Sequence, residues 1–400
     1  MSTAVAAALG ADVDLRPRRR AGWAGVALGV VAAYLAMPPL LVRSPLPSVV
    51  VGAVAVGLGA WAFGGGLRRL GIGAMVAGIM GAALAVAATE SGVGNLERVV
   101  AWGALGAATL RYATPLIFAA MGGVVSERSG VVNIGLEGML LSGAYFGVWG
   151  ADVTGGWVGG LAVAVASGAA FGLVHAAFSV TLKADQIVAG TAINFLALGI
   201  TGYLFVRTYG DQGTPNDLPE VPDVHLPIES VPFFGPALSD LNLLVWLGLL
   251  SVALLALVLF RTPLGVRLRS VGENPLAADT AGISVTRMRY AAVVASGVLA
   301  ALGGAFLSLG FVHSFTQNMT LGTGFIALAA VIFGKWRPGG ALAAALLFGF
   351  SSALAQRLPV FLPSAATLFE ALPYVLTLIA VAGLVGRSRP PAADGLPYER

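Results

Sequence analysis

A carboxylate lies inside a long apolar run in the first half of the chain, where Glu137 follows Asn133 by four residues. On a helix this spacing puts both side chains on one face. An ionisable residue within a membrane-spanning segment is a candidate functional residue by default. Two roles are open for Glu137: it accepts hydrogen bonds from backbone N–H groups where Gly130, Gly135 and Gly138 weaken the helix, or it contacts a solute on its path.

A second polar pair, Thr191 and Asn194, lies three residues apart in a later apolar run. This pair either lines a cavity, forming a translocation path with Asn133 and Glu137, or makes hydrogen bonds between helices. The chain has no P-loop, no Gly-x-Ser-x-Gly motif and no paired carboxylates spaced for acid–base chemistry. Its 3 histidines are scattered without metal-ligand spacing. We therefore expect no catalytic residue, no metal site and no cofactor bound by this chain.

A short helix is encoded in the polar segment 261–283. Asn274 is a good N-cap residue and Pro275 a good first helical residue, whereas Gly282 suits the left-handed conformation that ends helices. Ser284 is expected to cap the next span. A helix of about two turns is marginal in water by itself. It therefore packs against the protein's own loops or docks into a cytoplasmic partner.

The composition indicates whether the elements that carry these residues lie in water or in a membrane. Only 10% of the residues are charged and 57% are hydrophobic, whereas a soluble domain carries about 25% charged residues. So few charges cannot cover a water-exposed surface, but such a chain can face lipid. The 55 glycines follow no Gly-X-Y period and fit closely packed membrane helices. The absence of cysteine excludes disulfides and thiolate metal sites. The composition therefore predicts a polytopic membrane protein without a nucleic-acid partner.

Apolar runs recur along the chain, and a bilayer span needs about 20 such residues. The candidate runs are 21–41, 47–65, 71–89, 104–125, 131–149, 156–179, 187–206, 242–260, 290–310, 323–334, 339–356 and 367–386. The run 323–334 is too short to span alone at about 1.5 Å per residue, so we expect it to pair with 339–356 as a broken or re-entrant element. The predicted fold is all-α, with about 10–12 transmembrane or half-membrane helices.

Lys and Arg residues fall in alternate connections, and this bias sets the orientation of membrane proteins. It predicts that both termini are cytoplasmic. The connection 207–241, rich in Asp and Glu, is then an outer loop. We divide the chain into a cytoplasmic N-terminal tail (1–20), accessory transmembrane helices (21–90), a core (104–386) and a cytoplasmic C-terminal tail (387–400).

Four stretches of the core resemble the permease subunits of ABC importers of the branched-chain amino acid/ribose class. They are Thr114–Ile117, Asn133–Gly138, Gly272–Ile283, and Gly324–Ala329 with Phe333–Trp336. The nearest likeness is to the nucleoside-type permeases that work with basic-membrane-lipoprotein receptors. Leu136 stands where that family commonly has Ala, and Met139 where it often has Gln.

The resemblance implies a type II-like ABC importer permease in a bacterial-type cell membrane. Its expected partners are a second permease subunit, a cytoplasmic ABC ATPase that binds ATP and Mg, and an extracytoplasmic solute-binding lipoprotein. The ATPase would contact the loop through Glu273, Asn274, Pro275, Ala277, Ala278, Asp279 and Gly282.

The expected solute is a nucleoside, with a sugar or a branched-chain amino acid as alternatives. A different alternative is an ion-coupled secondary transporter that uses Glu137. A membrane-embedded transferase or hydrolase lacks any candidate constellation of residues.

Overall fold

The computed structural model describes residues 16–35, 44–90, 102–215, 217–228, 234–357, 371 and 389–399. The predicted last span, 367–386, and most of the predicted N-terminal tail lie outside the described residues. The chain divides into two compact units, which are considered separately. The first contains the helices that precede Leu105, and the second contains Gly106–Gln356 together with the C-terminal residues Arg387–Arg400.

The first unit consists of three helices that pack against one another: α2 (Arg16–Leu35), α3 (Leu46–Gly64) and α4 (Arg68–Glu90). Glycines allow α3 and α4 to approach closely. A Cβ atom on Gly52 would lie 2.6 Å from the carbonyl oxygen of Gly78. The outward side chains are also apolar, as expected of helices that face lipid. The predicted accessory segment 21–90 is thus a three-helix unit.

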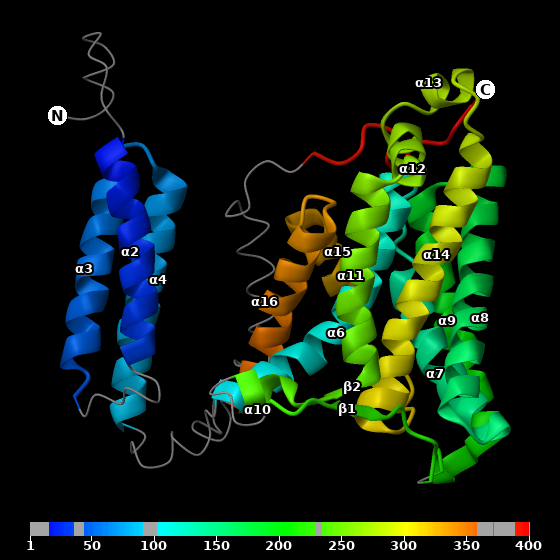
Figure 1. Cartoon of the computed structure of the whole chain (residues 1–400), viewed down its shortest axis with the longest axis horizontal. Helices are drawn as coiled ribbons and strands as arrows, with labels where there is room; N and C mark the ends of the chain where they lie inside the picture. Colours follow the sequence, from blue (N-terminus) through cyan, green and yellow to red (C-terminus); the bar gives the residue numbers. More distant parts are fainter. Residues whose placement is uncertain are drawn as a thin grey trace. The chain divides into compact units, whose positions relative to one another are not determined.

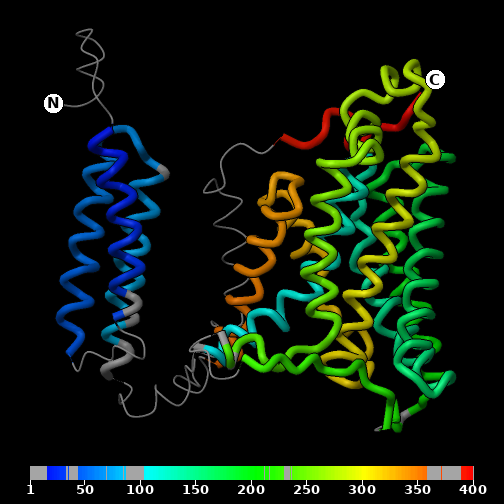
Figure 2. The backbone as a smooth tube through the Cα atoms, in the orientation of Figure 1, coloured from blue at the N-terminus to red at the C-terminus, as the bar shows by residue number. Residues whose placement is uncertain are grey.

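The second unit is a bundle of helices that run between two ends (Figures 1 and 2). These helices are α6 (Trp102–Arg128), α7 (Leu136–Thr154), α8 (Trp157–Ala176, continued by the π-helical turn Ala177–Thr181), α9 (Gln186–Tyr209), α11 (Leu243–Arg261), α14 (Val285–Ala305, continued by the π-helical turn Phe306–Val312), α15 (Thr323–Phe333) and α16 (Pro338–Arg357). One end, the strand end, carries the 3₁₀ turn Gly210–Gln212, β1 (Asp223–His225), α10 (Phe234–Leu238) and β2 (Asp240–Asn242). The opposite end, the α13 end, carries α12 (Pro263–Glu273) and α13 (Pro275–Thr280).

Within the described residues, 7 helices are long and apolar enough to cross a membrane. The predicted helical membrane architecture is therefore confirmed. The predicted run 131–149 starts too early, because α7 begins only at Leu136. The run 323–334, predicted to be too short to span alone, forms the 11-residue α15, and the 20-residue α16 follows it closely.

The all-α prediction misses a small antiparallel hairpin, in which β1 pairs with β2 and Val224 lies opposite Leu241. The Asn242 side chain donates to the carbonyl oxygen of Val221 at 2.7 Å and caps α11 by accepting from the Leu244 N–H at 3.1 Å. Three-residue strands carry too little periodicity to be seen in a sequence. The hairpin orders the connection that was predicted to be an outer loop.

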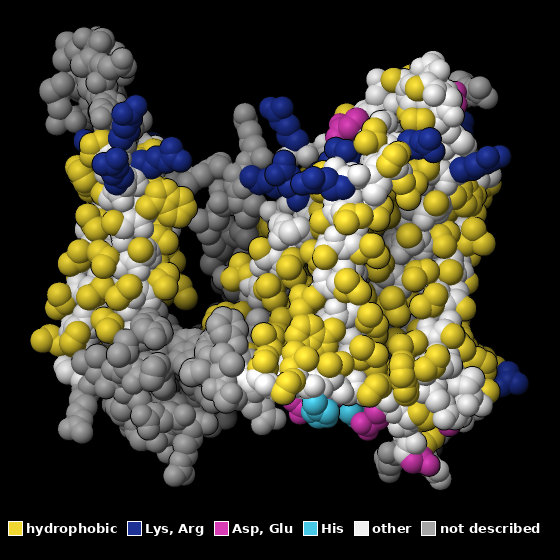
Figure 3. Space-filling view, in the orientation of Figure 1, with side chains coloured by type: hydrophobic (Ala, Val, Ile, Leu, Met, Phe, Trp, Pro, Cys, Tyr) yellow, Lys and Arg dark blue, Asp and Glu magenta, His cyan; other side chains and the backbone are white. Residues whose placement is uncertain are grey.

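Basic side chains gather at one end of the second unit and most acidic side chains in view at the other, although each end also carries the opposite sign (Figure 3). Figure 3 shows Lys and Arg side chains in a band at the α13 end, with His and several acidic side chains at the strand end. Arg267 and Arg269 belong to α12, and Asp223 and Asp240 to the strands. This agrees with the charge pattern of the predicted topology, although the orientation itself stays a prediction.

Small residues bring α7, α8 and α14 together in the core of the second unit. Gly168 on α8 and Gly297 on α14 face each other, and a Cβ atom on Gly168 would lie 2.5 Å from the Cβ of Ala301. Glycine at such crossings lets helix backbones approach and gain van der Waals contact. These small residues let α7, α8 and α14 pack closely against one another.

Candidate functional site

The segment 129–135, here called the α6–α7 break, is non-helical, as its glycines predict. Backbone groups freed within a membrane must find partners in the protein. The Val132 N–H donates to Gln186 Oε1 at 2.7 Å, and the Val132 carbonyl lies 3.1 Å from His175 Nε2. The N–H and the carbonyl of Val132 are thus both bound by side chains from the α8–α9 region.

Asn194 holds the last part of the same break. Its Nδ2 donates to the carbonyl oxygen of Ile134 at 3.0 Å, and its Oδ1 accepts from the Gly138 N–H at 2.8 Å. The amide therefore joins α9 to the start of α7 through two hydrogen bonds. The sequence left two roles open for Asn194, lining a cavity and making hydrogen bonds between helices, and these bonds show the second role directly.

Glu137 connects the start of α7 to the start of α15. Its carboxylate accepts hydrogen bonds from the Thr320 hydroxyl at 2.5 Å, the Gly322 N–H at 2.8 Å and the Gly324 N–H at 2.5 Å. The first N–H groups of a helix have no partner within it and favour a negative charge. Glu137 thus caps α15, a broken helix elsewhere in the chain, and not the break that precedes its own helix.

Asn133 is separated from Glu137 in the structure. It precedes α7, so the two do not share a helix face, and its side chain is 0% exposed. Asn133 Nδ2 donates to Ser296 Oγ at 2.9 Å. The position of Asn133 therefore fits a packing role against α14.

A cavity of about 410 Å³ brings together the other three predicted path residues; we call it the α9 cavity. Its lining includes Glu137, Thr191 and Asn194. Phe195, Leu198, Asn318 and Phe325 complete much of the remaining wall. A polar floor between aromatic and aliphatic side chains is typical of sites for small organic molecules.

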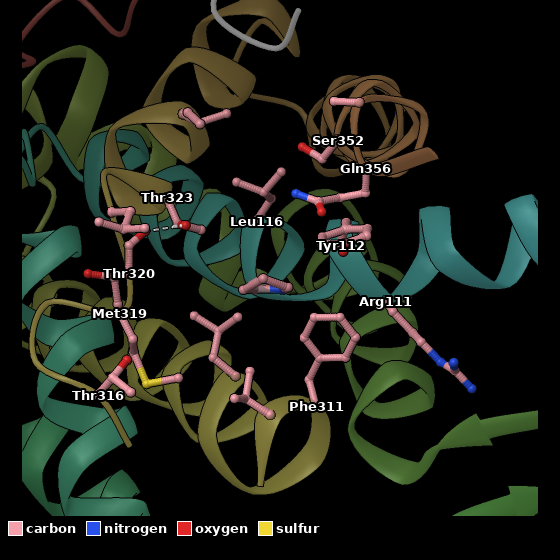
Figure 4. A pocket seen from close by; sticks show the side chains of 16 residues that line it. Arg111, Tyr112, Leu116, Phe311, Thr316, Met319, Thr320, Thr323, Ser352 and Gln356 are labelled. Carbon is pink, nitrogen blue, oxygen red and sulfur yellow. Dashed lines mark hydrogen bonds between the residues drawn. The ribbon is translucent and has the colours of Figure 1, made fainter. Parts of the chain in front are cut away.

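A second cavity, of about 440 Å³, was missed by the sequence reasoning; we call it the α16 cavity. Figure 4 shows its polar side chains, contributed by α6, by α15 with the segment before it, and by α16: Tyr112, Thr316, Thr320, Thr323, Ser352 and Gln356. Arg111 points away from it and donates to the carbonyl oxygen of Asp240 at 3.3 Å. The four-residue spacing of Ser352 and Gln356 in an apolar run was the available signal.

The hydrogen bond between Glu137 and Thr320 joins the linings of the two cavities. Thr320 lines the α16 cavity, Glu137 lines the α9 cavity, and Leu321 lines both. Movement of the segment before α15 would therefore change both cavities together. This arrangement can gate a path but contains no group poised for covalent chemistry.

The α13 helix forms as its local signals predict. Asn274 Oδ1 accepts from the Ala277 N–H at 3.0 Å, Pro275 is the first helical residue, and Gly282 has a φ of +81°. The cap predicted for Ser284 is wrong in one respect: Ser284 occupies the N-cap position of α14, but its side chain makes no capping hydrogen bond.

One side of α13 is covered by the protein itself. Ala278 is buried against Val271 and Val285, with Tyr398 packed on the same cluster. The other side is open, because Glu273, Asn274 and Ala277 are exposed, as are Leu276 and Gly282. Packing against the protein's own structure therefore occurs, and it leaves a face of α13 free for a partner.

Two motifs that are far apart in the sequence meet at the end of α6. Trp336 Nε1 donates to the carboxylate of Glu127, and Arg128 Nε donates to the carbonyl oxygen of Trp336 at 2.8 Å. Lys335 and Trp336 both have a φ of +54°, so the turn between α15 and α16 is tight. These contacts connect that turn to the α6–α7 break.

Comparisons with known proteins agree with this architecture. The family described as the permease component of the branched-chain amino acid transport system matches residues 106–381. The guanosine ABC transporter permease protein NupQ of Bacillus subtilis is 44% identical over 73% of this chain and 95% of its own length. The nucleoside ABC transporter permease protein NupC of Lactococcus lactis is 40% identical over 72% of this chain and 94% of its own length.

A permease protein of Haloferax volcanii, provisionally named for glucose transport, is 37% identical over 62% of this chain and 76% of its own length. No solved structure matches the chain. The family match covers most of the second unit, and it confirms the resemblance seen in the sequence. The chain belongs to the family of permease components of the branched-chain amino acid transport system.

Proposed function

We propose that this chain is the membrane-spanning permease subunit of an ABC importer and that it carries nucleosides. One observation carries the choice of solute: the likeness to a guanosine permease protein extends over 95% of that relative at 44% identity. The relative named for glucose is less similar, and a sugar is the first alternative.

The α9 cavity suits a nucleoside chemically. Its volume of about 410 Å³ lies within the range of about 300–1,000 Å³ that is usual for small-molecule sites. Phe195 and Phe325 offer aromatic faces on which a base can stack, a contact that contributes about 1–3 kcal/mol per base. Thr191 and Asn318 offer a hydroxyl and an amide to the sugar.

In this proposal the energy comes from a separate ATPase subunit, which binds ATP and Mg. The ATPase contacts the exposed face of α13, an extracytoplasmic lipoprotein delivers the solute, and a second permease subunit completes the path. Closure of the ATPase displaces α13, and the displacement reaches the α6–α7 break and the Glu137–α15 contact. The chain itself catalyses no covalent step. It resides in the cell membrane with both termini in the cytoplasm.

The test is uptake by proteoliposomes that contain the chain with its ATPase, second permease and receptor. ATP-dependent uptake of guanosine, adenosine or uridine is expected, and uptake of glucose or leucine is not. ATP-dependent uptake confined to glucose or leucine would overturn the choice of solute. Uptake by this chain alone, driven by a proton or sodium gradient, would overturn the ABC mechanism.

The contact with the ATPase has its own test. Asp279→Lys and Gly282→Val are expected to abolish uptake while membrane insertion is retained, since one reverses a charge on α13 and the other disfavours its left-handed end. Asp217→Lys, an exposed charge reversal on the connection at the strand end, is the matched control. Normal uptake by both α13 variants would remove α13 from the proposed mechanism.

A further inference from the structure

The C-terminal segment 389–399 lies against the α13 end of the second unit, as the last part of the trace shows in Figure 2. The Ala393 N–H donates to the carbonyl oxygen of Gly272 at 2.9 Å, and the Ala392 N–H donates to Glu273 Oε2 at 3.3 Å. Gly272 and Glu273 are the last residues of α12, directly before α13. The segment is therefore bound to the residues that position α13.

A buried cation provides the second attachment. Arg289, near the start of α14, is 0% exposed, and its Nη1 donates to the carbonyl oxygen of Leu396 at 2.9 Å. A buried charge that loses its partner is strongly destabilising. The Leu396 carbonyl of the C-terminal segment therefore supplies a hydrogen-bond partner to a charge that α14 buries.

Tyr398 provides the third attachment. It packs on the apolar cluster formed by Val271 of α12, Ala278 of α13 and Val285 of α14. The ring thus contacts a cluster that includes the single buried residue of α13. A displacement of α13 must displace this ring or open the cluster.

The segment also contacts the α6–α7 break. A Cβ atom on Gly130 would lie 3.0 Å from the carbonyl oxygen of Ala393, and one on Gly395 would lie 3.5 Å from Val132 Cγ2. Gly395 has a φ of +77°, which allows the chain to turn at this point. The segment therefore contacts both the cluster that holds α13 and the break that leads to Glu137.

We propose that the C-terminal segment 389–399 is a positioning element for transport: through Ala393, Leu396 and Tyr398 it holds α13 in place and transmits its displacement to the α6–α7 break. The inference rests on the proposed function, because α13 must be moved by an ATPase for the transmission to matter. It assigns a role in transport to the end of the chain, beyond the region that defines the family.

The test compares variants of the full chain in the assembled importer. Tyr398→Ala removes the ring from the cluster, Tyr398→Phe retains the packing, and Glu399→Gln is a neighbouring exposed control. Three quantities are measured: copurification of the ATPase, ATP hydrolysis, and nucleoside uptake. We expect Tyr398→Ala to assemble and hydrolyse ATP, with uptake per ATP reduced about tenfold, the factor that corresponds to about 1.4 kcal/mol of lost coupling.

Tyr398→Phe and Glu399→Gln are expected to retain the wild-type ratio of uptake to hydrolysis. Deletion of residues 389–400 keeps the proposal falsifiable if a point variant does not assemble. A wild-type ratio in both Tyr398→Ala and the deletion would overturn the proposal. If the wild-type importer itself takes up no nucleoside, the proposed function fails first, so the two failures are distinguishable.

Discussion

Replacing Glu137 by alanine tests whether this carboxylate holds α15 in place. The substitution removes the acceptor of three hydrogen bonds, from the Thr320 hydroxyl and from the N–H groups of Gly322 and Gly324. The bonds from Thr320 and Gly324 are buried, whereas the bond from Gly322 is only partly buried. Water from the α9 cavity can therefore replace one bond but not the other two.

The magnitude follows from those two buried bonds. A hydrogen bond to a charged group contributes about 1.5–3 kcal/mol, so the local stability of the α15 start should fall by about 3–6 kcal/mol. Each 1.4 kcal/mol corresponds to about a tenfold change in an equilibrium constant. Local opening of this region should therefore become at least about 100-fold more frequent.

Hydrogen exchange of peptides that cover residues 318–328 measures this opening directly. Glu137→Ala should lower protection in these peptides by about 100-fold or more. Glu137→Gln should have a smaller effect, because its amide oxygen still accepts while its NH₂ group faces a donor. Thr191→Ala is the matched control: it lines the same cavity, but its hydroxyl bonds the Ile187 carbonyl of its own helix.

Unchanged protection in Glu137→Ala would refute the capping role. If uptake were lost while protection stayed at the wild-type level, Glu137 would act on the solute and not on α15. The experiment therefore separates the two roles that the sequence left open for this residue.

Two further predictions concern helix packing and pH. Gly297→Ala places a Cβ atom against the carbonyl of Gly168 on α8 and should destabilise the protein by about 1–3 kcal/mol. The control is Gly199→Ala, whose new Cβ meets no atom within 4 Å and which should be neutral or stabilising. The measurement is the fraction of protein that stays folded after heating in detergent, and equal fractions for the two variants would contradict the prediction. Burial raises the pKa of the Asp394 carboxyl from 3.8 to about 7, and this effect outweighs Arg289 and a hydrogen bond from the Gly395 backbone, which both lower the pKa. Asp394 also interacts electrostatically with the carboxyl of Glu127. The docked C-terminal segment thus retains a proton that the free segment loses, so docking is strongest below 3.8 and weakens as the pH rises through about 7. Protease cleavage within 389–399 should therefore be faster at about pH 8 than at about pH 6, and Asp394→Asn should abolish the difference; a difference that persists in this variant would contradict the assignment.

Local signals explain which parts of the fold could be predicted. Asn274, Pro275 and Gly282 act on backbone groups within one helical turn, so α13 could be predicted residue by residue. Apolar runs specify spans for a similar reason, because a segment that crosses the bilayer must be apolar whichever helices it packs against. The hairpin of β1 and β2 gave no such signal, since its strands have three residues each.

The candidate site depended on contacts between distant residues. Glu137 was recognisable as an unusual carboxylate, but its partners lie 183 to 187 residues further along the chain. The four-residue spacing of Asn133 and Glu137 would place both side chains on one face only if a single helix contained both residues. It does not, because Asn133 lies in the α6–α7 break, before α7 begins. The α16 cavity requires three segments to converge, which no local pattern reveals.

The sequence by itself determined that the chain is a helical membrane protein, where most of its spans lie, and that a capped helix stands between two of them. Only the tertiary structure decided that Glu137 caps α15, that Asn194 pins the α6–α7 break and that residues 389–399 bind beneath α13. The physical reason is range: helix signals act over a few residues along the backbone, whereas these contacts arise when packed helices bring distant polar groups together in a region where water cannot satisfy them.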